Sequence, residues 1–185
     1  MAGSIFPFKG IWPRIAASAY IAPGAVVIGD VTIGEEVAIL SHAVLRGDSA
    51  PIVVGRGSNV QDSATVHADV GFPTLIGEYV VIGHNAIVHG TTIADICLIG
   101  MHATVLNGAE IGTGSIIGAA ALVAEGTIVP PRTLMLGVPA KPRRDITEEQ
   151  VVRIRDNAQT YVDLSRVYLA SGMGRLEDAF RGGAA

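Results

Sequence analysis

Cysteine, long apolar runs and clustered positive charge are all scarce in this sequence of 185 residues. Its single cysteine, Cys97, excludes an intramolecular disulfide and fits a reducing compartment. Although 49% of the residues are hydrophobic, Gly, Asp, Glu or His interrupts every run before it reaches the roughly 20 apolar residues of a membrane-spanning helix. We therefore expect no membrane span and assign the apolar residues to a buried core.

Basic residues are few and dispersed. The formal net charge is −4, and Lys and Arg are scattered as far as residue 132. A nucleic-acid groove needs cations gathered on one face, so we expect no nucleic-acid partner. The basic cluster at residues 141–144 is interpreted as a solvated turn. The first ten residues lack a basic segment followed by an apolar one, which favours a cytoplasmic location over export.

An aliphatic residue recurs every six positions over most of the chain. The series has twenty members: Ile15, Ile21, Val27, Ile33, Ile39, Leu45, Val54, Val60, Val66, Ile76, Ile82, Val88, Ile93, Ile99, Val105, Ile111, Ile117, Val123, Val129 and Met135. A period of six is neither helical nor that of a plain strand, so each repeat is expected to form one short strand and one corner. Repeats of this length are typical of parallel β-helices, in which each coil stacks on the last.

Three repeats per coil would form a triangular prism with the aliphatic side chains inside. Twenty positions make between six and seven coils, and strands ~4.8 Å apart make the prism about 30 Å tall. The interval between aliphatic positions lengthens at residues 46–53 and 67–75, where we expect loops that leave the prism. The β-helix domain is assigned to residues 1–140.

A single helix is predicted after the repeats, which end in a segment with two prolines. Thr147 and Gln150 form the pattern of a capping box, with acidic residues in the first turn, where the helix dipole favours anions. Apolar residues then follow at three- and four-residue steps up to Gly172, the expected C-cap: Val151, Ile154, Ala158, Tyr161 and Tyr168. We assign the helix to residues 146–171, packed along the prism, and a flexible tail to residues 173–185.

Three of the five histidines, His67, His84 and His89, provide the ligand count of a catalytic zinc site with one open position. In the repeat register, Arg46, His67 and His89 stack on one face, and coils ~4.8 Å apart allow the two histidines to share a metal ion. His84 stacks with Asp62 on another face, about 10 Å or more from His89 along the chain. One subunit cannot easily bring all three to one ion, whereas a three-fold symmetric trimer can.

Several motifs together resemble the gamma-class carbonic anhydrases over roughly residues 10–170. They are Leu-Arg-Gly-Asp at 45–48, Asn-Val-Gln-Asp at 59–62, His67, His-Asn-Ala-Ile-Val-His at 84–89 and the C-terminal helix. The resemblance implies a left-handed β-helix in a homotrimer, whose three histidines bind Zn²⁺, or else Fe²⁺ or Co²⁺, across the subunit interface. It also implies that a metal-bound hydroxide converts CO2 to bicarbonate.

The resemblance assigns roles to further residues. Arg46 and Asp48 match an ion pair between subunits. Gln61 and Asp62 match residues that orient the hydroxide, since an amide can hold it by one hydrogen bond and a carboxylate can accept its proton. Asn59 is placed with them in the catalytic group, and Tyr161 is placed in the pocket.

One part of the chain departs from the family. Its best-studied members carry proton-transferring glutamates just after the Arg-Gly-Asp segment and in an acidic loop after the first histidine, where this chain has Ser49 and a short loop at 68–74. The resemblance therefore supports metal binding better than fast turnover. His42 and His102 share a repeat position with Ser63 and Asn85, and an imidazole that titrates at about pH 6.5 could transfer the proton instead.

Two other functions stay open. Proteins with this repeat also include CoA-dependent acyltransferases that use a histidine base in a cleft between subunits, but the metal site leaves only His42 and His102 for that role. The chain could also be a metal-stabilised trimeric protein with little hydratase activity.

Overall fold

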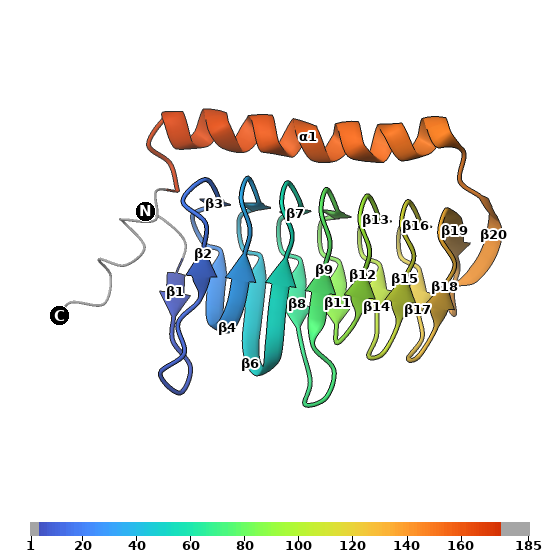
Figure 1. Ribbon diagram of the computed structural model, residues 1–185, viewed down its shortest axis with the longest axis horizontal. Coiled ribbons are helices and arrows are strands. Elements are labelled where there is room, and N and C mark those ends of the chain that lie inside the picture. Colours follow the sequence, from blue (N-terminus) through green and yellow to red (C-terminus); the bar gives the residue numbers. More distant parts are fainter. Residues whose placement is uncertain (1–3, 175–185) are drawn as a thin grey trace.

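The computed structural model describes residues 4–174, which form a left-handed parallel β-helix with one helix along its side (Figure 1). The first sheet contains β1 (Ser4–Phe6), β2 (Arg14–Ile15), β4 (Val26–Ile33), β6 (Val44–Val54), β8 (Thr65–His67), β9 (Thr74–Ile76), β11 (Ile87–His89), β12 (Thr92–Ile93), β14 (Thr104–Val105), β15 (Glu110–Ile111), β17 (Leu122–Val123) and β18 (Ile128–Val129). The second contains β3 (Tyr20–Ile21), β5 (Ala38–Ile39), β7 (Asn59–Val60), β10 (Val81–Ile82), β13 (Leu98–Ile99), β16 (Ile116–Ile117), β19 (Thr133–Leu136) and β20 (Lys141–Asp145).

Three hexapeptides make one coil, as the sequence predicts. Val60 on β7 pairs with Ile82 on β10, and Ile82 pairs with Ile99 on β13, so each coil lies directly on the one before it. Nineteen of the twenty repeat positions are at most 3% exposed, and Ile15 in the first coil is partly buried. The removal of this aliphatic surface from water, at about 25 cal/mol per Å², stabilises the prism.

The prediction of a loop at residues 46–53 is wrong, because these residues belong to the strand β6. Buried and more exposed side chains alternate at its two ends, whereas none of residues 48–51 is buried. Arg46 pairs with Ile28 on β4, and Ile52 pairs with Val31, with a register shift between the two stretches. Residues 48–51, which include the extra ones, therefore form a bulge between two paired stretches of the same strand.

The second break in the repeat does form a loop. Residues 68–73 leave the prism between β8 and β9, and the backbones of Asp69 and Phe72 pair across the loop (Figure 1). At its base, the buried hydroxyl of Thr74 donates to the carbonyl of His67 and accepts from the N–H of Gly90. The loop is therefore tied to both strands that carry the stacked histidines.

The basic segment at residues 141–144 is a strand rather than the predicted turn. β20 pairs with β19 in the antiparallel direction, and all five of its residues are exposed. Exposed charge and a proline are typical of an edge strand, because both discourage pairing with a further strand. The prediction that this segment is solvated is confirmed.

Helix α1 (Glu148–Ala170) lies along the length of the prism (Figure 1). Its capping box is formed: Gln150 N–H donates to Thr147 Oγ1 at 3.3 Å, and Thr147 N–H donates to Gln150 Oε1 at 3.2 Å. The fully buried face consists of Ile154, Ala158, Val162 and Ser165. Of the five residues predicted for this face, two are buried and the other three are partly exposed.

The C-cap of α1 is Ser171, and Gly172 follows it with φ +82°. The predicted cap was therefore one residue too late, although the glycine is needed for the left-handed backbone just after the cap. The predicted tail lies outside the described residues from residue 175 onward. Within residues 4–174, no helix combines the length and apolarity needed to cross a membrane.

Candidate metal centre

Two of the predicted ligands stack in register on one face of the prism. His67 at the end of β8 pairs with His89 at the end of β11, and Arg46 on β6 pairs with His67 on its other side. Their Nδ1 (His67) and Nε2 (His89) atoms are 2.9 Å apart. The stacking register that the sequence predicts for this face is therefore confirmed.

The other ring nitrogen of His67 contacts Asp48. His67 Nε2 lies 2.9 Å from Asp48 Oδ1, and Arg46 donates to the second oxygen. Partial burial acts to raise the pKa of Asp48, but the hydrogen bonds from His67 and Arg46 outweigh it and lower the pKa to about 2. An ionised carboxylate only accepts, so His67 donates through Nε2 and keeps a lone pair on Nδ1.

The remaining nitrogen of His89 contacts an amide. His89 Nδ1 lies 2.7 Å from Asn107 Oδ1, and Asn107 Nδ2 donates to Asp69 Oδ2 at 2.9 Å. Because the amide oxygen accepts, His89 donates through Nδ1 and keeps a lone pair on Nε2.

The two lone pairs therefore point at each other across 2.9 Å. Such an arrangement is repulsive unless a proton or a cation lies against both atoms. Two nitrogens bound to one tetrahedral zinc ion at about 2.0–2.1 Å are roughly 3.3 Å apart, which is close to the observed separation. Within the part of the chain that the structure describes, the group able to hold a metal ion is His67, Asp69 and His89. The donor set thus fits a divalent cation.

His84 lies apart from this group. Its Nδ1 is 3.0 Å from Asp62 Oδ2, and both side chains are partly exposed. A hollow of about 240 Å³ between α1 and the second sheet is lined by His84, Gln61 and Tyr161, with Met101 and Asn157 among its other residues. Burial, with a smaller effect from the charge of Asp62, raises the pKa of Tyr161.

The predicted catalytic amides form a buried pair beside this hollow. Gln61 Nε2 donates to Asn59 Oδ1 at 3.1 Å. Both residues are at most 5% exposed, and Asn59 Nδ2 has no hydrogen-bond partner among the described residues. The pairing fixes the orientation of the Gln61 amide, because one of its two N–H groups is already in use.

Within one subunit, Arg46 and Asp48 contact each other, and their pairing across a subunit interface stays a prediction. Arg46 and Asp48 lie two positions apart on β6, and their side chains meet along that strand. His42 and His102 occupy one column of corners, where both have left-handed backbone conformations and exposed side chains.

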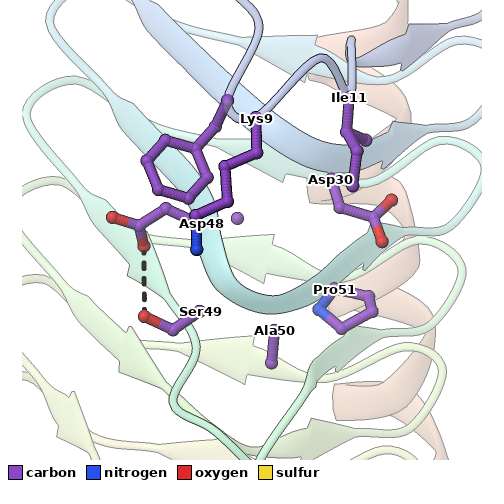
Figure 2. Close-up of a pocket in the computed structure, with 9 residues that line it drawn as sticks. Lys9, Ile11, Asp30, Asp48, Ser49, Ala50 and Pro51 are labelled. Carbon is purple, nitrogen blue, oxygen red and sulfur yellow. Dashed lines mark hydrogen bonds between the residues drawn. The ribbon is translucent and has the colours of Figure 1, made fainter.

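A second hollow, of about 190 Å³, lies beside Asp48 where β6 bends (Figure 2). Lys9, Asp30 and Pro51 line it together with Asp48 and Ser49. Ser49 Oγ donates to Asp48 Oδ1 at 3.4 Å. Ser49 stands where the resemblance places a proton-transferring glutamate, and its hydroxyl cannot exchange a proton near neutral pH as a carboxylate can. The hollow lets solvent approach Asp48 but lacks that acid.

Asp69, Thr74 and Asn107 were missed by reasoning from the sequence. Asp69 lies in the loop that interrupts the repeat, and Thr74 begins β9 just after it, so periodicity gives no side-chain direction for either residue. Asn107 lies at a corner, one position beyond the residue that the repeat register would place against His89. The only signal in the sequence was their polar character close to the histidine motifs.

Known proteins with carbonic anhydrase names are similar to this chain over most of its length. A Methanocaldococcus jannaschii protein named "Probable carbonic anhydrase" is 50% identical over 151 residues, which cover 82% of this chain and 95% of that protein. The carbonic anhydrase of Geobacillus kaustophilus is 43% identical and covers 90% and 91%. The mitochondrial gamma carbonic anhydrase 2 of Arabidopsis thaliana is 37% identical and covers 89% and 62%.

Solved structures with transferase names are also similar. A candidate acetyltransferase of Bacillus cereus is 40% identical, with a TM-score of 0.89 and coverage of 91% of this chain and 98% of that one. A hexapeptide transferase family protein of Anaplasma phagocytophilum is 39% identical, with a TM-score of 0.86 and coverage of 89% and 98%. No protein-family model matches the chain. The repeat, the stacked histidines and the curated relatives agree that the chain belongs to the gamma-class carbonic anhydrase family of hexapeptide-repeat proteins.

Proposed function

We propose that the chain is a metal-dependent carbonic anhydrase that interconverts CO2 and bicarbonate at a site between the subunits of a homotrimer. The observation that carries the proposal is the convergence of the lone pairs of His67 and His89. His84 of a neighbouring subunit would complete the ligand set. Zn²⁺ suits three imidazole ligands, and Fe²⁺ and Co²⁺ are the alternatives.

A divalent cation held by these residues would lower the pKa of a water molecule bound to it to about 7. The protein's own groups hold and orient what lies beside it. Asn59 fixes the amide of Gln61, which keeps one N–H and a carbonyl oxygen for a small polar substrate. Asp62 beside His84 provides a carboxylate that can hold a proton at the edge of the hollow.

The site lacks the glutamates that transfer the proton to solvent in the family's best-studied members. Ser49 and the loop at 68–73 provide no glutamate, and the assignment of His42 or His102 to this step stays a prediction. We therefore expect hydration to be limited by proton release and to be faster in concentrated buffer. The buried single cysteine supports a reducing compartment, and we propose a cytoplasmic location.

The first prediction is that His67→Ala, His84→Ala and His89→Ala each remove most of the bound metal and most of the CO2 hydration activity. Each change deletes one ligand of a three-ligand site, which leaves too few nitrogens to hold the ion. Metal content per subunit is measured by elemental analysis, and hydration is measured by stopped flow with a pH indicator. His42→Ala is the matched control and should keep its metal.

Full metal occupancy in any one of the three variants would contradict the ligand assignment. Acetyl-CoA turnover, assayed on the same preparations, tests the acyltransferase reading that the solved structures with transferase names support. Turnover that survives removal of the metal by a chelator, together with absent hydration, would favour that alternative.

A further inference from the structure

Three side chains from separate parts of the fold form a hydrogen-bonded chain that ends at His89. Asp69 lies in the loop after β8, Asn107 lies at the corner after β14, and His89 ends β11. The carboxylate of Asp69 accepts from Asn107 Nδ2 at 2.9 Å, and Asn107 Oδ1 lies 2.7 Å from His89 Nδ1. All three side chains are partly buried, so water competes only weakly for these bonds.

The hydrogen bonds that join Asp69, Asn107 and His89 can run in only one direction. A carboxylate only accepts, so the NH2 group of Asn107 must face Asp69, and its oxygen must face His89. His89 then carries its proton on Nδ1 and its lone pair on Nε2. We propose that Asn107 is a positioning residue that holds His89 in this tautomer, and that Asp69 sets the orientation of the Asn107 amide.

The backbone near Asn107 leaves space for this amide. A Cβ atom on Gly90 would lie 2.1 Å from Asn107 Oδ1, and Gly90 has φ +57°. An alanine there would push the amide away from His89 and would also strain the backbone. The residue after His89 thus has to be a glycine if the amide is to reach the imidazole.

His89 is the one stacked histidine with a neutral partner. Asp48 accepts from His67 as a carboxylate, which has no second orientation to adopt. An amide can turn by 180° and would then present an N–H to His89, which would move the ring proton to Nε2. Asp69 prevents this turn, and so a loop residue outside the three predicted histidine ligands controls the tautomer of one of them. This consequence for metal binding rests on the proposed function.

The experiment compares the His89 tautomer in the metal-free full-length protein by long-range ¹H–¹⁵N NMR of its imidazole. The wild type should show a protonated Nδ1. Asn107→Leu should give a mixture of tautomers, and Asp69→Asn should move the proton toward Nε2. The double variant Asp69→Asn with Asn107→Asp exchanges donor and acceptor and should restore a protonated Nδ1. Glu125→Leu is the matched control, because Glu125 is an exposed residue at the same corner one coil further on.

Zinc affinity, measured by competition with a chromophoric chelator, is the second readout. Asn107→Leu should bind zinc 10- to 100-fold more weakly than the wild type, and the double variant should recover most of that loss. An unchanged tautomer in Asn107→Leu, or a double variant no better than the single ones, would overturn the proposal. A wild type that binds no zinc would instead refute the proposed function, and the NMR comparison would still decide the role of Asn107.

Discussion

Each histidine of the proposed site has an oxygen acceptor of its own beside one ring nitrogen. His67 has Asp48, His84 has Asp62 and His89 has Asn107. An acceptor at one nitrogen leaves the lone pair on the other and fixes the direction in which it points. At the scale of the residue, the site is therefore defined as much by these partners as by the imidazoles themselves.

The partner of His67 is the easiest to test. Asp48→Asn should lower zinc affinity by about tenfold or more, because an amide can turn its N–H toward His67 and Arg46 loses its carboxylate. Chelator competition gives the affinity. Asp30→Asn is the control, since Asp30 lines the same hollow (Figure 2). Its carboxylate pairs with Arg14 and not with His67. Equal losses in the two variants would mean that the effect comes from surface charge and not from His67.

The sequence predicts the ligands better than their partners. A six-residue period fixes which backbone positions stack, and this is enough to place His67 against His89. It says nothing about side chains that turn at a corner, as Asn107 does, or that enter from a loop, as Asp69 does. Their directions depend on hydrogen bonds that form only when three distant segments have folded together.

At the scale of the element, a break in the repeat has two physical meanings. The three extra residues in β6 form a bulge between two stretches that both stay paired with β4. The four extra residues after His67 leave the prism as a loop between two separate strands. The interval alone cannot separate these cases, because spacing counts residues and does not show where the backbone hydrogen bonds go.

Helix α1 is attached to the prism by charge as well as by its apolar face. Glu36, at a corner of the prism, accepts hydrogen bonds from Arg166 on α1 and from Arg56. These bonds lower the pKa of Glu36 below its ordinary value of 4.5. Tyr20 stacks on Tyr168 of the helix, with ring centroids 5.1 Å apart.

Glu36→Gln should therefore lower the free energy of unfolding at pH 7, by roughly 1 kcal/mol for a partly exposed network. Because the folded pKa is depressed, the ionised carboxylate stabilises the wild type fully above about pH 4.5 and loses this effect as the pH falls through the folded value. The difference between wild type and variant should thus be constant near neutrality and shrink in acid. Urea unfolding at several pH values measures it.

Glu149→Gln provides the control for this helix. Glu149 pairs with Arg153 within α1, and both side chains are about three-quarters exposed. Its loss should change stability little at any pH. A difference for Glu36→Gln that persists unchanged at pH 2 would show that packing, and not the ion pairs, attaches the helix there.

At the scale of the whole molecule, one chain gathers only part of the proposed ligand set. His67 and His89 converge on one face, whereas His84 pairs with Asp62 beside the hollow under α1. A three-fold assembly places one face of a subunit against a different face of its neighbour, which is the arrangement that this division requires. A wild type that sediments as a monomer would therefore refute both the assembly and the shared site.

Hybrid trimers test the division of ligands directly. A site would take His67 and His89 from one subunit and His84 from the next, so a His84→Ala subunit followed by a His67→Ala subunit forms one intact site. Random mixing of equal amounts should restore about a quarter of the sites, since each of the two positions is filled correctly half of the time.

His67→Ala mixed with His89→Ala should restore none, because both residues must come from the same subunit. Refolded mixtures are compared by metal content per subunit and by CO2 hydration, with each variant refolded alone as the baseline. Recovery in both mixtures would place His67 and His89 on different subunits, and recovery in neither would leave no role for a neighbour's His84.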